Sequence, residues 1–509
     1  MRLSKRSKKS LNLRNTVNEY HEVKLVFMSK SGLLTILQLN DSHGYFELHP
    51  ELYWAGDKAL YREAGGYARI ATLFKQTRQE HPGTVIALDN GDTIHGTFLA
   101  VQSEGETLVP ILNTLAFDGM TAHWEFAYGP DHFKKIVDKL DFPMLAVNCY
   151  EKSTDKLVFP PFQVIKRGSL RAGVIGIAAT IVDKTMPKRF SKGIYFTLGN
   201  KELPQYIQHL RENEAVDIII VLSHLGYPQE LKLAEEVDGI DVLLSGHTHN
   251  PLYEAVVVNG AIVIQSGCHG SFIGRLDLQV ENGRVRDFCH QLIKVDESIE
   301  PDPEVETIVN DALAPHRDML NTVVGNTETA LNRNTVMEAT MDNLLLQALI
   351  DVGDVELAFS NGWRYGAPVL PGPITMNDLW NIIPTNPPVS LCEITGAELW
   401  GMMEENLEHT FSRDPYKQMG GYVKRCLGLN IYFKVENPDG KRIQEFFIGG
   451  KRLDRSRTYT ACFVTTQGVP ERYGKDRHNL DIDAIDALKE YLAKHDKVSA
   501  EIRGSIIPV

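Results

Sequence analysis

Four short segments of the sequence combine aspartate and histidine in ways that suit metal binding. They are "NDSHG", "DNGDTIHGT", "LSHLG" and "SGHTHN", and they contribute Asp41, His43, Asp89, Asp92, His224, His247 and His249. A lone histidine is often structural, and an aspartate before a turn often only forms that turn. As a set, however, imidazole and carboxylate groups are ligands for Zn, Fe, Mn or Mg. In Asp-x-His and His-x-His, both side chains of an extended segment point the same way.

These ligand types indicate a site for two divalent metal ions. A carboxylate such as that of Asp92 has two oxygens and can bridge two cations. Two metal ions ~3.5–4 Å apart generate a hydroxide nucleophile and bind the oxygens of an in-line displacement. The motifs therefore predict a metal-dependent hydrolase.

The ligand motifs follow short apolar runs, which predict the strands that position them. The runs are rich in Val, Ile and Leu and mostly end in polar residues; they cover 32–40, 83–90, 142–148, 172–179, 216–224 and 241–247. Continuous apolar strands indicate a sheet buried on both faces. Helical segments at 201–214 and 227–237 lie between some of the runs. The predicted class is α/β, in which function gathers beyond the carboxyl ends of strands.

Changes in pattern along the 509 residues indicate two domains. We expect a basic, disordered tail at 1–30 and a catalytic domain at 31–296. A connector at 297–325 opens with an acidic, proline-containing loop and continues as a helix at about 304–320. The second domain is expected at 326–509.

The composition argues against some classes of function. The formal net charge is −13, which is unsuited to a protein that binds nucleic acid polymers through a basic face. A local metal site can still attract a small anionic substrate. The basic stretch "MRLSKRSKKSLNLRN" is not followed by an apolar run long enough for a signal peptide or a membrane span. We therefore expect a cytoplasmic protein with no membrane partner, and the sequence leaves its oligomeric state open.

With these residues in place, the chain resembles the calcineurin-like metallophosphoesterases, in the branch of bacterial 5′-nucleotidases and UDP-sugar hydrolases. Besides the ligand motifs, "QSGCHGSFIGRLDLQV" (265–280), "MEATMDNLLLQAL" (337–349) and the segment 360–399 resemble parts of that family. The resemblance covers nearly the whole chain. It implies an N-terminal four-layer α/β/β/α metallophosphoesterase domain and a C-terminal α+β domain of the 5′-nucleotidase type.

The resemblance also implies how the ligands divide between two metal ions. One ion would bind Asp41, His43, Asp92 and His249. The other would bind Asp92, His224, His247 and one residue of 121–130. The implied activity is the hydrolysis of a small phosphorylated substrate, a nucleotide or a nucleotide derivative, in nucleotide catabolism.

The stretch "TAHWEFAYGP" (121–130) departs from the family, which has Gly-Asn-His-Glu here, often followed by Phe-Asp. In that pattern the Asn binds the second metal ion, and the His, steadied by the Asp, assists the transition state or the leaving group. One register places His123 on the Asn, Trp124 on the His and Ala127 on the Asp. The other makes His123 the catalytic imidazole and Trp124 an insertion. We prefer the first register, in which His123 is a metal ligand, because it needs no insertion.

In the preferred register Trp124 replaces the catalytic histidine. An indole offers only an N–H donor and exchanges no proton near neutral pH, so assistance worth ~10²–10⁴-fold would be missing. "HWEF" and "NGWRYG" resemble segments of the sulfur-oxidising thiosulfohydrolases, which share this two-domain fold. Two alternatives to a nucleotidase therefore stay open: a hydrolase of a sulfur ester or a thiosulfonate, and a non-catalytic nucleotide-binding relative.

Substrate contacts are expected from the second domain. Arg364 could bind a phosphate through two hydrogen bonds, and Asn361 and Trp363 belong to the same segment. The segment 461–474 falls where the family places one of the two Phe side chains that stack on a nucleobase, and it offers Phe463 and Tyr473. The alternative is that these aromatic side chains belong to the core. His95 and His269 lie near the ligand motifs and are expected either to support the metal ligands or to be structural.

Overall fold

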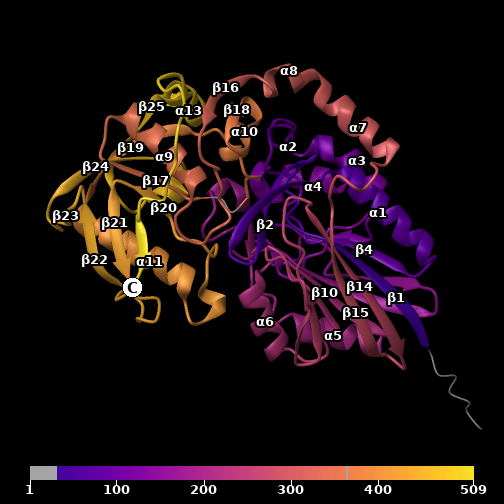
Figure 1. Ribbon diagram of the computed structural model, residues 1–509. Coiled ribbons are helices and arrows are strands. Elements are labelled where there is room, and N and C mark those ends of the chain that lie inside the picture. Colours follow the sequence, from indigo (N-terminus) through magenta and orange to yellow (C-terminus); the bar gives the residue numbers. More distant parts are fainter. Residues whose placement is uncertain (1–30, 363–364) are drawn as a thin grey trace, which may run out of the picture.

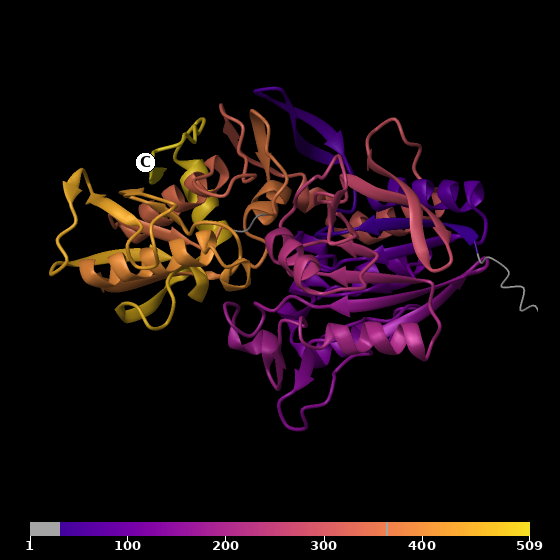
Figure 2. The ribbon, with the colours of Figure 1, turned by 90° about the horizontal axis from the view of Figure 1, so that it is seen from below.

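The computed structural model describes residues 31–362 and 365–509, which form two parts that lie side by side (Figures 1 and 2). The expected tail at 1–30, together with Trp363 and Arg364, lies outside the described residues. The first part contains two large sheets and the ligand motifs, and the second part contains smaller sheets with three longer helices.

The first large sheet has five strands in the order β15-β14-β1-β4-β5. β1 (Ser31–Leu39), β4 (Val85–Asp89) and β5 (Gly119–Met120) are parallel. β14 (Phe272–Glu281) pairs antiparallel with β1, and β15 (Arg284–Lys294) pairs antiparallel with β14. The parallel strands are the ones that deliver Asp41, His43 and Asp92.

The second large sheet has six strands in the order β12-β13-β11-β10-β8-β7. Its four central strands are parallel, namely β8 (Leu170–Ile177), β10 (Ile218–Ser223), β11 (Val242–Leu244) and β13 (Ala261–Ile264). β7 (Phe162–Arg167) and β12 (Val256–Val258) pair antiparallel at the two edges.

The two sheets pack face to face. Ile36 and Ile86 of the first sheet and Val174 and Ile220 of the second belong to one fully buried cluster. Outside them, α1 (Tyr67–Glu80) and α3 (Val109–Leu115) cover the first sheet, and α5 (Leu203–Glu212) and α6 (Tyr227–Glu236) cover the second. The predicted α/β/β/α layering is therefore confirmed, because each sheet buries apolar side chains on both of its faces.

The apolar run at 142–148 is not the strand that its composition suggested. Its backbone makes only brief contacts with two different sheets. Around an isolated bridge to Met120 of the first sheet, Met120 N donates to Pro143 O at 3.0 Å and Leu145 N donates to Met120 O at 2.8 Å, whereas Val147 N donates to Gly176 O of the second sheet at 2.8 Å. The segment crosses from the first sheet to the second and cannot pair along either. A short strand, β6 (Cys149–Glu151), begins only after the crossing and pairs with β9 (Ile194–Phe196).

The connector runs over the first part toward the second (Figure 1). It contains α7 (Pro303–Leu313), a 3-10 turn (Ala314–His316) and α8 (Arg317–Leu320). The Asp302 side chain caps α7 by accepting from Val305 N. One helix was predicted over 304–320, but Pro315 has no N–H to continue the hydrogen-bond ladder, so the helix breaks there.

The second part has a five-stranded and a four-stranded sheet, in the orders β20-β17-β24-β19-β25 and β23-β22-β21-β26. The strands are β17 (Leu357–Ser360), β19 (Pro388–Thr395), β20 (Arg425–Leu427), β21 (Leu429–Phe433), β22 (Ile443–Ile448), β23 (Lys451–Arg452), β24 (Thr458–Phe463), β25 (Lys475–Asp483) and β26 (Ile506–Pro508). The longer helices are α9 (Thr340–Gly353), α11 (Gly396–Phe411) and α13 (Ala484–Ala493). This is the α+β arrangement that the sequence predicted.

Within residues 31–362 and 365–509, no helix combines the length and the apolar character needed to cross a bilayer. The cytoplasmic location stays a prediction.

A buried ionic cluster supports the loop that faces the first part. Arg333 Nη2 lies 2.9 Å from Asp342 Oδ1, and Arg425 Nε lies 3.1 Å from Asp342 Oδ2. All three side chains are almost completely buried. Arg333 Nη1 also donates to Tyr365 O at 3.2 Å. Asp342 therefore holds two guanidinium groups under the loop that carries Asn361 and Tyr365.

Replacing Asp342 with alanine should strongly destabilise the second part. The change leaves two buried guanidinium groups without their carboxylate, which costs about 3–5 kcal/mol in comparable buried pairs. Urea unfolding followed by circular dichroism measures the loss. Glu445→Ala is the matched control, because its ion pair with Arg452 is exposed and should contribute about 1 kcal/mol or less. Equal midpoints for the two variants would contradict this account.

Candidate metal centre

The metal-binding motifs meet at the carboxyl ends of parallel strands from both large sheets. Asp41 and His43 follow β1, Asp92 follows β4, His224 follows β10, and the pair His247 and His249 follows β11. The parallel strands of the two packed sheets end at the same side, so these loops converge. Every one of these side chains is buried except that of His249, which is slightly exposed.

The loops that carry the ligands are held in an unusual backbone conformation. Left-handed φ values occur at Asp41 (50°), His43 (51°), Asp92 (56°), His247 (68°) and His249 (60°). Non-glycine residues rarely adopt this region, and where they do, the surrounding structure must enforce it. Here the loops hold each other, because Asp41 N donates to Gly91 O at 2.9 Å and His43 N donates to Asp92 O at 2.8 Å. Such clustered strain is typical of functional sites.

The first ligand set consists of Asp41, His43, Asp92 and His249. His43 Nε2 and His249 Nε2 face each other at 3.1 Å, and His249 Nε2 lies 3.2 Å from Asp41 Oδ1. Zn–N bonds measure about 2.0–2.1 Å. Ring nitrogens and carboxylate oxygens that lie this close together can therefore all bind the same cation. This is the set that the family resemblance implied for one metal ion.

The second ligand set consists of Asp92, His123, His224 and His247. His123 Nδ1 lies 2.9 Å from Asp92 Oδ2, and His224 Nε2 lies 3.3 Å from the same oxygen. His224 Nδ1 donates to Asn90 O at 2.6 Å, which fixes the tautomer and turns the Nε2 lone pair toward the site. The buried Nε2 atoms of His123 and His224 have no hydrogen-bond partner among the described residues. Buried imidazoles of this kind fit a divalent metal ion.

Asp92 connects the two sets. Its Oδ1 accepts from Trp124 N at 2.8 Å, and its Oδ2 faces His123 and His224. Burial alone would lower the pKa of His224, but the Asp41 and Asp92 carboxylates outweigh it and raise that pKa to about 10. The same carboxylates would attract a cation in place of the proton. Protons and metal ions compete for such ligands, so metal affinity should fall as the pH falls.

Glu125 fixes the 121–130 stretch against the Asp92 loop. Its Oε2 accepts from His123 N at 2.7 Å, and its Oε1 accepts from Thr93 N at 2.7 Å. Gly91 allows the close approach, because a Cβ there would lie 2.6 Å from Thr121 O. The clamp brings His123 into the second ligand set, which is the arrangement that the preferred register predicts. A catalytic role for His123 stays the alternative.

Asp89 belongs to neither ligand set among the described residues. Its carboxylate accepts from Gly91 N at 2.9 Å and from Thr93 Oγ1 at 2.8 Å. Burial raises its pKa to about 7. Asp89 therefore shapes the turn that presents Asp92.

A tyrosine of the second part, which the sequence reasoning overlooked, covers the metal centre. The ring of Tyr365 stacks on His43 with centroids 4.3 Å apart, and its hydroxyl lies 2.9 Å from His95 Nε2. His95 in turn stacks on Trp124 at 4.5 Å with an interplanar angle of 5°. The sequence feature that could have pointed to Tyr365 is "RYG", which closely follows Asn361. Its tyrosine is one more polar aromatic residue beside the proposed substrate contacts.

Two residues of the first part dock the loop that carries Tyr365. His269 Nε2 accepts from Gly366 N at 3.2 Å, while its Nδ1 lies 2.8 Å from Glu51 Oε2. The Tyr45 hydroxyl accepts from Ala367 N at 2.7 Å. His49, Glu51 and His269 also lie close enough together to hold a cation. The hydrogen bonds of His269 give this group a structural role, as expected for that residue.

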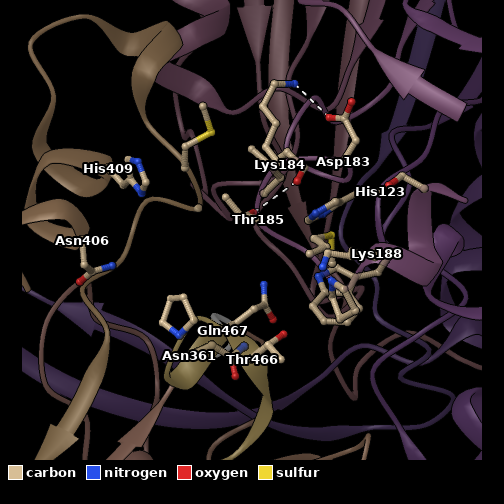
Figure 3. A pocket seen from close by; sticks show the side chains of 18 of the residues that line it. His123, Asp183, Lys184, Thr185, Lys188, Asn361, Asn406, His409, Thr466 and Gln467 are labelled. Carbon is tan, nitrogen blue, oxygen red and sulfur yellow. Dashed lines mark hydrogen bonds and ion pairs between the residues drawn. The ribbon is translucent and has the colours of Figure 1, made fainter. Parts of the chain in front are cut away.

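A cavity of about 1040 Å³ lies between the two parts and reaches the metal centre. Figure 3 shows Lys184, Thr185 and Lys188 on one side, with His123, and Asn361, Asn406, His409 and Gln467 on the other. Ligand pockets commonly occupy about 300–1,000 Å³. The cavity can therefore hold a substrate larger than the group that is cleaved.

The proposed substrate residues divide between the cavity and the core. Asn361 lines the cavity, and its buried Nδ2 has no partner among the described residues. Phe463 is buried with Arg477 over its ring at 4.5 Å, and Tyr473 donates its hydroxyl to Glu405 at 2.9 Å; neither is among the residues that line the cavity. Tyr422, which follows two glycines, does line it and was overlooked. Trp363 and Arg364 lie outside the described residues.

Comparison with known proteins agrees with this architecture. Residues 321–466 match the family described as "5′-nucleotidase, C-terminal domain". The chain is 24% identical to the 5′-nucleotidase of Vibrio vulnificus, covering 91% of each protein. It is 24% identical to the trifunctional nucleotide phosphoesterase YfkN of Bacillus subtilis, covering 94% of this chain but 35% of that protein.

Two solved structures resemble nearly the whole chain. The sulfate thiohydrolase SoxB of Thermus thermophilus superposes with a TM-score of 0.87 at 24% identity, covering 94% of this chain and 96% of SoxB. A 5′-nucleotidase precursor from Thermus thermophilus superposes with a TM-score of 0.81 at 21% identity, covering 94% and 99%. The chain has the two-domain fold of the 5′-nucleotidases, with their C-terminal domain. The first and second parts are hereafter its N-terminal and C-terminal domains.

Replacing Asp92 with asparagine should lower both metal content and activity. The amide removes the negative charge that the two ligand sets share. The loss should be at least the ~10–100-fold that follows removal of groups behind a metal ligand. Inductively coupled plasma analysis and a turnover assay measure the two effects. Asp131→Asn is the control, because Asp131 is exposed in the first turn of α4 (Pro130–Val137) and lies outside both sets. An Asp92→Asn protein with unchanged metal content and turnover would rule out a shared ligand.

Replacements of His123 distinguish the two registers of the 121–130 stretch. If His123 is a ligand, His123→Asn should largely preserve metal content, because an amide oxygen suits Mn²⁺ or Mg²⁺. His123→Ala should lower it, because one ligand is lost. His132→Ala, a histidine of α4 (Pro130–Val137) outside the ligand sets, should leave metal content unchanged. Full metal content with abolished turnover in His123→Asn would instead make His123 the catalytic imidazole.

Proposed function

We propose that this chain is a dinuclear, metal-dependent hydrolase that releases phosphate from a nucleotide or a nucleotide derivative. The observation that carries the proposal is the pair of ligand sets that share Asp92 and open into the interdomain cavity. Two divalent cations would supply Lewis-acid activation of water and of the phosphoryl group there. Mn, Zn, Fe and Mg are all candidates, because the donors mix imidazole and carboxylate.

The residues around the metal centre suit the binding of a phosphorylated substrate. Asn361 offers its Nδ2 as an unused donor inside the cavity. Tyr365 covers His43 and keeps bulk water from that side of the site. Tyr422 offers a ring on which a nucleobase can stack. These groups come from the C-terminal domain, so a productive complex needs both domains together.

Protonation of the leaving group is the least typical feature of the site. Trp124 stands where the family resemblance places the catalytic histidine, and it offers no exchangeable proton near neutral pH. His95 stacks on it, but burial lowers the pKa of His95 to about 3, so this ring is neutral near pH 7. We therefore expect faster turnover of esters whose leaving group needs little protonation.

The lack of a proton donor for the leaving group also supports a second candidate function. Hydrolysis of a sulfur ester or a thiosulfonate is favoured by Trp124 and by the fold likeness to SoxB, which is described as a sulfate thiohydrolase. A protein that binds nucleotides without turning them over is the third candidate, because binding needs the cavity but no proton donor.

A substrate panel tests these candidates against each other. The protein loaded with Mn²⁺, Zn²⁺, Fe²⁺ or Mg²⁺ is incubated with nucleoside mono- and diphosphates, simple phosphomonoesters and thiosulfonates. Release of phosphate that is lost in Asp92→Asn is the expected result. Release of sulfate alone would replace the proposal by the sulfur reaction. Tight nucleotide binding, measured by calorimetry, with no product from any substrate would identify a binding protein.

A further inference from the structure

The cavity wall of the C-terminal domain contains a buried lysine. Lys424 directly precedes β20 and is 7% exposed. Its backbone N donates to Asn406 Oδ1 at 2.7 Å, and its Nζ donates to Gln467 O. Lys424 lines the same cavity as Asp92 and His123. An ammonium group is thus fixed inside the space that also reaches the metal centre.

The charge of Lys424 is not neutralised within the described residues. No carboxylate among them lies within 4.0 Å of its Nζ. Glu405 belongs to the same wall, but its carboxylate pairs with Arg472 and accepts from the Tyr473 hydroxyl at 2.9 Å. A buried charge without a partner is costly, and burial lowers the pKa of Lys424 to about 8. The group is still protonated near pH 7, so an anion in the cavity would stabilise it.

The lysines of the opposite wall, unlike Lys424, have carboxylate partners. Lys184 lies 3.2 Å from Asp183, and Lys188 lies 3.0 Å from Glu471. Both are also exposed to solvent, which stabilises their charge without a ligand. Several lysine ammonium groups therefore line the cavity. Lys424 differs from Lys184 and Lys188 because it is deeply buried and has no ion pair in the described structure.

A second donor lies near Lys424. Asn361 is 3% exposed, its Oδ1 accepts from Thr465 Oγ1 at 3.3 Å, and its Nδ2 has no partner among the described residues. Asn361 and Lys424 therefore both bond to the turn α12 (Thr465–Gly468), one to Thr465 and the other to Gln467. Figure 3 shows Asn361 beside Thr466 and Gln467 at the cavity. An unused amide donor and an uncompensated ammonium group thus flank one turn.

We propose that Lys424, with Asn361, binds a second anionic group of the substrate, apart from the group cleaved at the metal centre. The inference rests on the proposed function, since it concerns the same cavity. It narrows the substrate class to esters that carry a further phosphate or carboxylate, such as a nucleoside diphosphate derivative or the phosphoester of a hydroxy acid. The cavity is large enough for both groups to bind at once.

The test compares substrates that differ only in the second anionic group. Alkyl phosphates of several chain lengths are paired with the ω-carboxyalkyl phosphates and the bisphosphates of the same lengths. The wild-type protein should show a higher kcat/KM for the doubly anionic member at the chain length that spans the cavity. In Lys424→Met this preference should fall roughly 10- to 100-fold, as expected for a charge-assisted hydrogen bond. The carboxylate and bisphosphate arms show which anion is preferred.

Two further variants make the result specific. Lys424→Arg keeps the charge and should retain part of the preference, whereas Lys188→Met removes a charge that is already paired and should leave the preference close to that of the wild type. Lys424→Met should melt at or above the wild-type temperature, because replacing a buried charge by an apolar group of similar size is often stabilising. A preference unchanged in Lys424→Met, or lost equally in Lys188→Met, would overturn the proposal.

If the proposed function is wrong, the wild-type protein will turn over no phosphoester, and this result is distinct from a failure of the Lys424 proposal. In that case calorimetry with inorganic pyrophosphate still tests the lysine: binding that weakens in Lys424→Met but not in Lys188→Met supports the anion site. Equal binding by all three proteins overturns it.

Discussion

The carboxylate of Asp92 is the interaction on which the rest of the site depends. It is buried between two sheets, accepts from the backbone of Trp124 and faces imidazoles from two other loops. A carboxylate in such surroundings is stable only when positive charge or donors surround it. The left-handed turns at the ligands, the Glu125 clamp and the close approach of Gly91 all place groups around this one charge. Much of the local backbone strain is thus explained by the need to gather ligands at Asp92.

The site also depends on the contact between the domains. The Tyr365 loop is docked through two of its backbone N–H groups on His269 and Tyr45, and the buried cluster around Asp342 supports it from behind. As a result, Tyr365 of the C-terminal domain stacks on His43, a candidate metal ligand of the N-terminal domain. The contact between the domains therefore shapes one side of the candidate metal centre. Substrate groups that contact both domains would favour the closed arrangement.

The chemistry of the cavity follows from where charges are paired and where they are not. Lys184 and Lys188 at its rim have carboxylate partners, whereas Lys424 in its wall has a backbone carbonyl. The metal centre attracts one anionic group, and Lys424 is placed to attract another. The indole of Trp124 and the neutral ring of His95 leave little capacity for proton transfer between them. A substrate with a good leaving group and a second negative charge fits both observations.

The sequence by itself predicted the candidate ligands and the α/β class of the first domain. Asp-x-His and His-x-His at the ends of apolar runs are local patterns, and a strand presents them the same way wherever it packs. Continuous apolar runs likewise predict sheets buried on both faces. The preferred register of the 121–130 stretch likewise assigned His123 to the second ligand set, where the structure has it 2.9 Å from Asp92.

Other features were decided only by tertiary structure. The run at 142–148 is apolar enough for a strand, but its backbone is divided between two sheets. Phe463 and Tyr422 are both aromatic residues of the C-terminal domain, yet one is packed under Arg477 and the other lines the cavity. Tyr365 reaches His43 because of how the two domains meet, and the nearby Glu405 is paired with Arg472 rather than with Lys424. Such contacts join residues from separate segments of the chain, so no local pattern can encode them.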